Sequence, residues 1–172
     1  LHDLGKYADR FQARLRGEDS GLDHWSQGAW LALLRHRAKA AALAIQGHHV
    51  GLRRGDAPAL KALNPATLQP RTPDGLELSD PDPDKLERRA LADGLLFSTP
   101  VATALPRSND MARPVSAMLD VRLLFSCLVD ADFLDTEAHF NGNAEGKRYR
   151  AAGPELDAPL ALAALDRYTA VL

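Results

Sequence analysis

The sequence predicts an all-α fold, and two observations lead to this prediction. Period-2 runs of Val, Ile, Thr and aromatic residues, which are typical of strands, are nearly absent, whereas Ala and Leu dominate the apolar positions. Apolar residues also recur every three or four positions in several segments, as they do in amphipathic helices. We therefore expect a helical bundle whose helices are joined by long irregular loops.

Two helical segments are expected in the first fifty residues. The first runs from about Leu4 to Leu15 and ends before a polar loop. The second begins near Asp23, which is a plausible N-cap, or near His24. Positions 38–46 continue or restart this helix, and Gly47 ends it. The expected inner face of the second segment comprises Trp30, Leu33 and Leu34.

The rest of the chain alternates irregular and helical segments. Residues 51–84 are rich in Pro and Gly, so they are expected to be irregular apart from a short helix near 57–63. A modest helix is expected over about 85–93, and a last one near 159–172. The strongest element runs from about Arg113 to Phe140. Its apolar positions, three or four residues apart, include Ala117, Val121, Leu124, Leu128 and Ala131.

Composition and charge narrow the functional classes. A chain of 172 residues is long enough for one domain with a real core. Cys127 is the single cysteine, which excludes an intrachain disulfide and a zinc site with two cysteines from one chain. A net charge of −2 gives no global attraction to nucleic acid, although it allows a local basic patch. Apolar runs are too short to span a membrane and no leader is visible, so a cytoplasmic location without membrane association is expected.

Imidazole and carboxylate side chains fall at the ends of the expected helices. His2 and Asp3 open the chain, His24 precedes the second helical segment, and His48 and His49 follow it. Imidazole nitrogen and carboxylate oxygen together are typical ligands of divalent Mn, Fe, Co, Ni and Zn. Helical bundles form such sites from inward side chains of several helices. A metal site is therefore expected, in which a carboxylate such as Asp3 or Asp132 can bridge two ions.

Two further carboxylates, Asp130 and Asp132, lie within the apolar run 123–134, where an uncompensated charge is costly. At about 100° per residue, and with Leu124 at the centre of the inner face, Asp132 lies about 80° and Asp130 about 120° from that centre. The two carboxylates point to different sides, so one of them is expected to be a metal ligand. An ion pair with a nearby arginine is the alternative role.

The succession His-Asp, His, His-His, Asp on a helical scaffold resembles the HD superfamily of metal-dependent phosphohydrolases. Its details resemble one branch, the HD nuclease domain of the CRISPR-associated helicase-nuclease of type I systems. The matching stretches are Leu1 to Lys6 (LHDLGK), His24 to Ser26 with Gly28-Ala29, Gly47 to His49 (GHH), and Ser126 to Glu137 (SCLVDADFLDTE). The resemblance thus covers residue 1 to about 140 and implies an HD-domain helical bundle.

The resemblance implies that six side chains bind one or two divalent ions, with Mn, Fe, Co or Ni expected. These ligands are His2, Asp3, His24, His48, His49 and Asp132. The late aspartate of this branch follows an alanine and precedes an aromatic residue, which fits Asp132 between Ala131 and Phe133. Asp130 then becomes a capping or ion-paired residue.

The implied activity is metal-dependent cleavage of single-stranded DNA in CRISPR interference, an antiviral defence. Asp3 and Lys6 are the expected catalytic residues, because Lys6 lies one helical turn from Asp3 and can stabilise the scissile phosphate. A solvated lysine is the alternative. Arg53 and Arg54, soon after the paired histidines, are the best-placed phosphate contacts. Further candidates are Arg10, Arg14, Arg16, Arg35, Arg37 and Lys39. Trp25 can stack on a base or anchor the helix start.

The implied partners are single-stranded DNA, a superfamily 2 helicase domain in cis or in trans, and the CRISPR RNA-guided surveillance complex. No phosphate-loop motif occurs, so the helicase is not expected within 1–172. The resemblance implies that this range is a single HD nuclease domain. This branch has another metal-binding histidine upstream of His-Asp, and a first helix is therefore expected to be missing. Two alternatives remain: an HD phosphohydrolase of nucleotides or cyclic nucleotides, and an inactive metal-binding helical module that docks partners.

Overall fold

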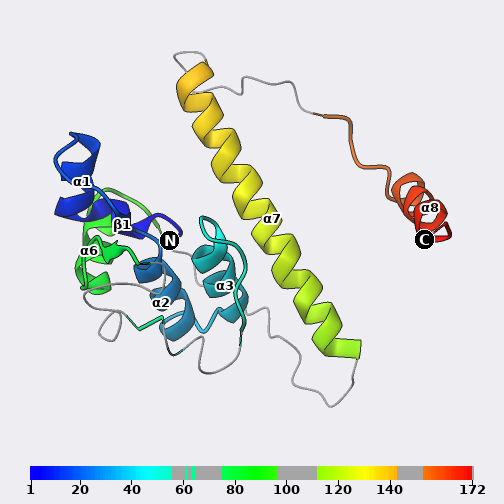
Figure 1. Cartoon of the computed structure of the whole chain (residues 1–172), viewed down its shortest axis with the longest axis horizontal. Coiled ribbons are helices and arrows are strands. Elements are labelled where there is room, and N and C mark those ends of the chain that lie inside the picture. The colour runs from blue at the N-terminus through cyan, green and yellow to red at the C-terminus, as the bar shows by residue number, and fades with distance from the viewer. Residues whose placement is uncertain (56–60, 62, 65–74, 97–111, 143–152, 172) are drawn as a thin grey trace. The chain divides into compact units, whose positions relative to one another are not determined.

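The computed structural model is mostly helical, as predicted, and describes residues 1–55, 61, 63–64, 75–96, 112–142 and 153–171 (Figure 1). The elements in order are η1 (Leu4–Tyr7), α1 (Asp9–Leu15), β1 (Leu22–Asp23), α2 (Ser26–Leu34), α3 (Lys39–Gly47), β2 (Glu77–Leu78), α6 (Pro83–Ala92), α7 (Ala112–Asn141) and α8 (Ala158–Thr169). The short helix predicted near 57–63 lies largely outside the described residues. The chain divides into two compact units, Leu1–Asp132 and Phe133–Leu172.

The helix predicted over 4–15 is divided into two, so the prediction of one continuous helix is wrong. η1 is a 3-10 helix, and Ala8 is extended (φ −73°, ψ 143°) before α1 begins. This division allows η1 to lie against the chain before α2, where the amide of Gly5 donates to the carbonyl of His24 at 2.8 Å. The break therefore positions the residues that precede Leu4.

The second predicted segment restarts, giving α2 and α3. The prediction that Asp23 is the N-cap is wrong, because α2 begins at Ser26 with Trp25 as its N-cap. The Asp23 carboxylate instead accepts from the amides of Trp25 (3.0 Å) and Ser26 (2.9 Å), just before the helix. The predicted inner face is partly wrong, since Leu34 is 57% exposed. The fully covered positions of α2 on the side that packs with α3 are small, Ala29 and Ala32. Small side chains allow the two helices to approach closely.

A two-stranded sheet that was not predicted joins residues 22–23 to residues 77–78. β1 and β2 are parallel, with Leu22 opposite Glu77 and Asp23 opposite Leu78. Just after β2, the Ser79 hydroxyl donates to the carbonyl of Gly5 at 3.0 Å. α6 then begins after the cap Asp82. The sheet and this loop thus fasten η1 to the start of α2.

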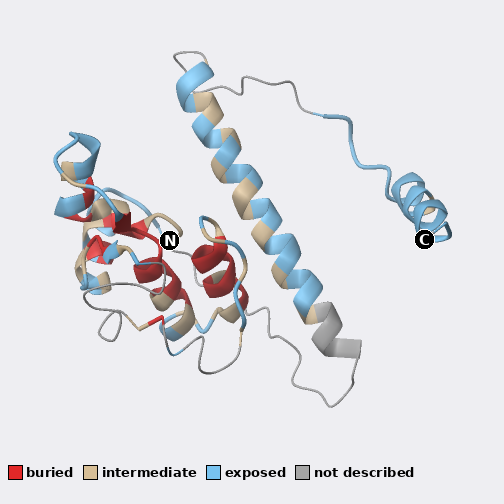
Figure 2. Cartoon of the chain, viewed as in Figure 1, coloured by how far each residue is buried: buried red, intermediate tan, exposed pale blue. Residues whose placement is uncertain are grey.

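Two clusters of buried side chains form the core of the first unit, and Figure 2 shows buried residues concentrated in α2, α3 and around β1. One cluster comprises Leu4, Ala8, Phe11, Leu22, Leu31, Leu86 and Ala90. The other comprises Trp25, Ala29, Ala32, Ala42, Ile45 and Leu63, with Leu128 of α7 packed against it. The first cluster supports η1 and the second supports the ends of α2 and α3 that carry histidines.

α7 covers the predicted range, but its inner face differs from the prediction. Leu124, taken as the centre of that face, is 42% exposed, whereas Phe125 and Leu128 are partly covered. At about 100° per residue, Asp132 lies about 20° from Phe125 and Asp130 about 140° from it. Asp132 therefore lies on the same partly covered face of α7 as Phe125, whereas Asp130 is exposed.

The second unit contains the end of α7 and α8. Asp157 caps α8, and its carboxylate accepts from the amide of Leu160 at 2.9 Å. No residue of α8 among those described is buried. In the part of the chain that the structure describes, no helix has the length and apolar character needed to cross a membrane.

Candidate metal centre

Two groups of side chains in the first unit are arranged as metal ligands, and they share Asp3. In each group the potential ligand atoms lie within 4.8 Å of one another. The first group comprises Asp3, His24, His48 and His49. The second comprises His2, Asp3 and Asp132. We call these six residues the histidine–aspartate cluster.

Four segments contribute to the cluster. His2 and Asp3 precede η1, and His24 follows β1. His48 is the C-cap of α3, with His49 next to it, and Asp132 comes from α7. The structure therefore brings together the six predicted ligands from positions up to 130 residues apart in the sequence.

Asp3 lies at the centre because its two oxygens face different groups. Asp3 Oδ1 is 3.3 Å from Nε2 of His24 and 3.9 Å from Nε2 of His48. Asp3 Oδ2 is 3.2 Å from Nε2 of His2 and 2.6 Å from Nζ of Lys6. Such a carboxylate can bridge two ions through its two oxygens.

His48 is oriented as a ligand by its backbone. Its Nδ1 is 2.6 Å from the carbonyl of Ile45, so the Nδ1 hydrogen donates there and Nε2 keeps its lone pair. The side chain is 1% exposed, and Nε2 has no hydrogen-bond partner. Asp3 Oδ1 is likewise buried and unpartnered. Buried polar atoms without partners are costly, and a cation between these two would satisfy both.

The spacing of the donors fits a divalent ion. Two donors that each bond an ion at about 2.1 Å lie about 3 to 4 Å apart. Nε2 of His49 is 3.0 Å from Nε2 of His24, which is itself 3.3 Å from Asp3. In the second group, Nε2 of His2 is 3.6 Å from Oδ1 of Asp132. Both groups therefore fit a divalent ion in donor type and in spacing.

The charge states of the cluster also suit cation binding. Burial of Asp3 would raise the pKa of its carboxyl, but the surrounding imidazoles and the Lys6 ammonium outweigh burial and hold that pKa well below its usual range. Burial of the His49 ring, together with repulsion from the neighbouring imidazoles, lowers the pKa of His49 to about 4. At neutral pH, Asp3 is ionised and His49 is neutral, which are the forms that bind metals.

Two glycines of the matching stretches make this arrangement sterically feasible. A Cβ on Gly5 would lie 2.6 Å from the Ser79 hydroxyl and would collide with the backbone of His24. A Cβ on Gly28 in α2 would collide with the carbonyl of Leu1. The backbone that carries His2 and Asp3 can therefore lie against His24 and α2 because both positions lack side chains.

A buried polar network behind the histidines was missed by the sequence analysis. Asp23 is fully buried and accepts from the hydroxyl of Ser26 at 2.6 Å. The same hydroxyl lies 3.2 Å from Oε1 of Gln46, near the end of α3. Burial raises the pKa of Asp23, against the opposing effect of the hydrogen bonds it accepts. The network joins the start of α2 to the end of α3, and polar residues at covered helical positions were its one signal in the sequence.

The predicted basic residues differ in their surroundings. Arg10 is paired with Asp19 and Glu77, and Arg35 with Asp84 and Glu87. Arg53 and Arg54 are exposed and follow the paired histidines on the same segment. Trp25 is buried and packs against the rings of His24 and His49, so it anchors the start of α2.

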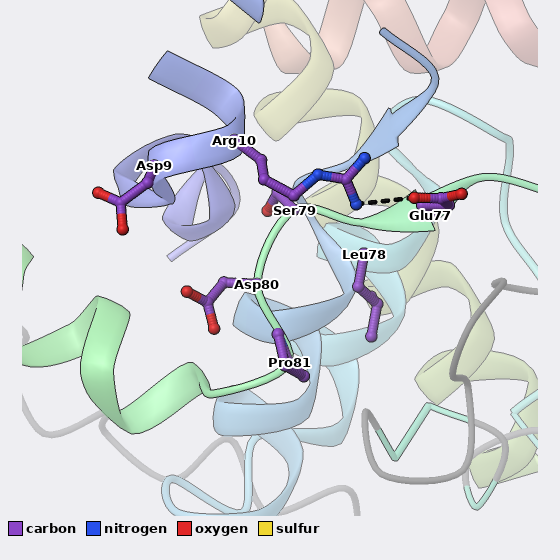
Figure 3. Close-up of a pocket in the computed structure, with 7 residues that line it drawn as sticks. All are labelled: Asp9, Arg10, Glu77, Leu78, Ser79, Asp80 and Pro81. Carbon is purple, nitrogen blue, oxygen red and sulfur yellow. Dashed lines mark hydrogen bonds and ion pairs between the residues drawn. The ribbon is translucent and has the colours of Figure 1, made fainter. Parts of the chain in front are cut away.

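A hollow of about 340 Å³ lies between α1 and the segment 77–81 and is shown in Figure 3. Its charged groups are paired: Arg10 with Glu77 at 2.8 Å, and Asp80 with Lys85 at 2.6 Å. Asp9 is paired with Arg89 at 2.8 Å. We call these residues, together with Asp19, the salt-bridged surface. Because its carboxylates already have cationic partners, it lacks the unpartnered donors that mark the histidine–aspartate cluster.

Comparisons with models of protein families, with curated proteins and with solved structures found no match to this chain. The chemistry of the site therefore rests on the geometry above.

Proposed function

We propose that this chain is a metal-dependent phosphodiesterase that cleaves single-stranded DNA. The observation that supports this most strongly is the sharing of Asp3 by two groups of metal-type donors. Two adjacent cation sites joined by a carboxylate are a recurrent arrangement for in-line displacement at phosphorus. The resemblance to the HD nuclease branch agrees with this proposal.

The residues of the chain would divide the work as follows. His24, His48, His49 and Asp3 would hold one divalent ion, and His2, Asp3 and Asp132 would hold a second. Such ions, of which Mn, Fe, Co and Ni suit this donor set, lower the pKa of water and neutralise phosphoryl charge. Lys6, whose Nζ lies 2.6 Å from Asp3, places a positive charge beside the same carboxylate, where it can attract the scissile phosphate.

The exposure of the cluster favours a polymeric substrate over a single enclosed nucleotide. The side chains of His2, Asp3 and Asp132 are 34%, 25% and 27% exposed, and His49 is exposed as well. Donors that face solvent on one side can receive a phosphate from a passing strand. In CRISPR interference, the strand would come from a superfamily 2 helicase, in cis or in trans, recruited by the RNA-guided surveillance complex.

The direct test is degradation of end-labelled single-stranded DNA by the purified chain with EDTA, Mn, Co, Ni or Mg. His48→Ala removes a buried ligand, and His139→Ala, an exposed histidine outside the cluster, is the matched control. We expect cleavage with a transition metal, loss of cleavage in His48→Ala and full activity in His139→Ala. Calorimetry should likewise show metal binding by the wild type and by His139→Ala, and weaker binding by His48→Ala.

Two results would replace this proposal. Hydrolysis of nucleotides or cyclic nucleotides, with labelled DNA left intact under every metal, would indicate a nucleotide phosphohydrolase. Metal binding without hydrolysis of any phosphodiester would indicate an inactive metal-binding helical module.

A further inference from the structure

A cleft of about 590 Å³ lies in the first unit between α3, the segment that follows it, and α7. Four basic residues line it, Lys39, Arg53, Arg54 and Arg122. Among the described residues that line the cleft, none is acidic. Basic side chains thus reach the cleft from three separate segments of the chain.

The remaining lining is apolar, which distinguishes this cleft from a simple phosphate patch. Leu43, Leu52, Met118 and Val121 line it, and 49% of the surface of Met118 is exposed. Within the described ranges, Lys39 and Arg122 have no carboxylate partner. In the hollow of Figure 3, by contrast, the basic side chain of Arg10 is paired with Glu77. Lys39 and Arg122, beside an apolar lining, therefore favour an anion that carries apolar groups.

The cleft and the histidine–aspartate cluster lie at opposite ends of the same pair of helices. Lys39 and Leu43 of α3 share the cleft with Met118 and Val121 of α7. Further along, Gly47 lies beside Phe125, where a Cβ would be 3.3 Å from the ring. Beyond this contact, His48 comes at the end of α3 and Asp132 comes further along α7. The two helices therefore run in the same direction here.

The separation matches a few nucleotides. His48 follows Lys39 by nine positions along α3 and its C-cap, and a rise of 1.5 Å per residue makes this about 14 Å. A stacked strand advances about 3.4 Å per nucleotide, so about four nucleotides span that distance. A strand whose scissile phosphate lies at the cluster can therefore reach the cleft.

We propose that this cleft binds the flank of a single-stranded nucleic acid, with phosphates on Lys39, Arg122 and the two arginines of residues 53–54 and with bases against Leu43 and Met118. This inference rests on the proposed function. A single strand suits the cleft because its unpaired bases expose apolar faces, whereas a duplex presents phosphates and would leave the apolar floor uncovered.

The test measures binding of fluorescein-labelled dT12 to the full chain in EDTA, by fluorescence anisotropy at several salt concentrations. The double variant Lys39→Gln/Arg122→Gln removes two predicted contacts, and Arg88→Gln removes an exposed arginine on α6 as the matched control. A slope of about −0.7 per phosphate contact gives about fivefold weaker binding per lost contact at 0.1 M salt, or about 25-fold for the double variant. Met118→Glu should also weaken binding, and a duplex of the same length should bind less tightly.

Equal affinity of the double variant and the wild type would overturn the inference. A second result would also overturn it: dodecyl phosphate displaces the oligonucleotide, and single strand and duplex bind equally well. That result would indicate an anionic amphiphile as the occupant. Hydrolysis of bis(p-nitrophenyl) phosphate by the wild-type chain with Mn is measured separately. This substrate is too small to reach the cleft, so its hydrolysis reports on the proposed function while the EDTA binding assay reports on the cleft.

Discussion

The histidine–aspartate cluster and the salt-bridged surface are both rich in ionisable groups, but their carboxylates have different partners. On the salt-bridged surface, Asp9, Asp19 and Asp80 each have a lysine or arginine nitrogen within 2.8 Å. In the cluster, the neighbours of Asp3 and Asp132 are mainly imidazoles, and Asp3 Oδ1 and His48 Nε2 have no hydrogen-bond partner. The first arrangement is complete as it stands, whereas the second is satisfied by a cation.

This difference separates structural charge from functional charge. Exposed ion pairs contribute little to the free energy of folding, and their removal is tolerated. Buried donors without partners cost free energy, and they persist in sequences when a ligand uses them. Substitutions in the two regions should therefore have effects of different size and on different properties.

The largest effect is expected from Asp3→Asn. The amide keeps the size of the side chain but removes the negative charge and one of the two carboxylate oxygens of the residue that both groups share. Loss of residues that merely orient a ligand lowers metal affinity or activity about 10- to 100-fold, so loss of the shared ligand should lower DNA cleavage by more than about 100-fold. Initial rates with Mn would measure this. Asp80→Asn is the matched control, and an equal loss of activity in both variants would remove the distinction between the two regions.

A divalent ion should stabilise the cluster end of the first unit. An ion at 100 times its dissociation constant raises the free energy of unfolding by about 2.7 kcal/mol. We expect the Tm measured by scanning fluorimetry to rise on addition of Mn and to return when EDTA is added. His48→Ala should lose most of the rise and His139→Ala should keep it. A rise of equal size in His48→Ala would contradict assignment of the ion to the cluster.

The next effect concerns the backbone that carries Asp3. In Gly5→Ala the new methyl group would collide with His24 and approach Ser79, so η1 must move. Overpacking of this kind costs about 1–3 kcal/mol. Denaturant unfolding should show that loss and calorimetry should show weaker metal binding. Gly153→Ala, where a Cβ meets no atom within 4 Å, should change neither.

Lys6→Gln should reduce cleavage by about tenfold, less than the loss of an oxyanion-hole donor in an enclosed site, because Lys6 is 43% exposed. Metal affinity should not fall, since the substitution removes a cation that competes for Asp3. Steady-state rates with Mn and calorimetry would separate these effects. Unchanged cleavage would show that Lys6 pairs with Asp3 but does not act on the scissile phosphate.

The helices were largely predictable because local signals set their ends. α6 begins at Pro83 after Asp82, and α8 begins at Ala158 after Asp157, both within one or two residues of expectation. The six metal ligands, by contrast, were implied by the resemblance to the HD nuclease branch, and the structure brings these side chains together. Local signals were sufficient where the residues that set a helix end lay within one turn of it.

The unpredicted features depend on contacts between distant segments. β1 and β2 contain two residues each, too few to show a strand period, and their pairing joins positions 55 residues apart. The burial of Asp23 depends on Ser26 and on Gln46 of another helix. The inner face of α7 was misjudged because Leu124 and Phe125 are both apolar, and the fit of Phe125 beside Gly47 decides between them.

The smallest effect is expected on the salt-bridged surface, from Asp9→Asn. The Asp9 side chain is 73% exposed, and its hydrogen bond with Arg89 lowers the pKa of its carboxyl below the ordinary value of 3.8. A lowered pKa in the folded state adds stability that is present above the ordinary pKa and is lost as the pH falls through the lowered one. The variant should therefore have a slightly lower Tm at pH 7, and the difference from wild type should shrink in strong acid. Metal binding and cleavage should stay unchanged, because this pair completes itself without a ligand, whereas a loss of metal binding in Asp9→Asn would mean that the two regions are coupled.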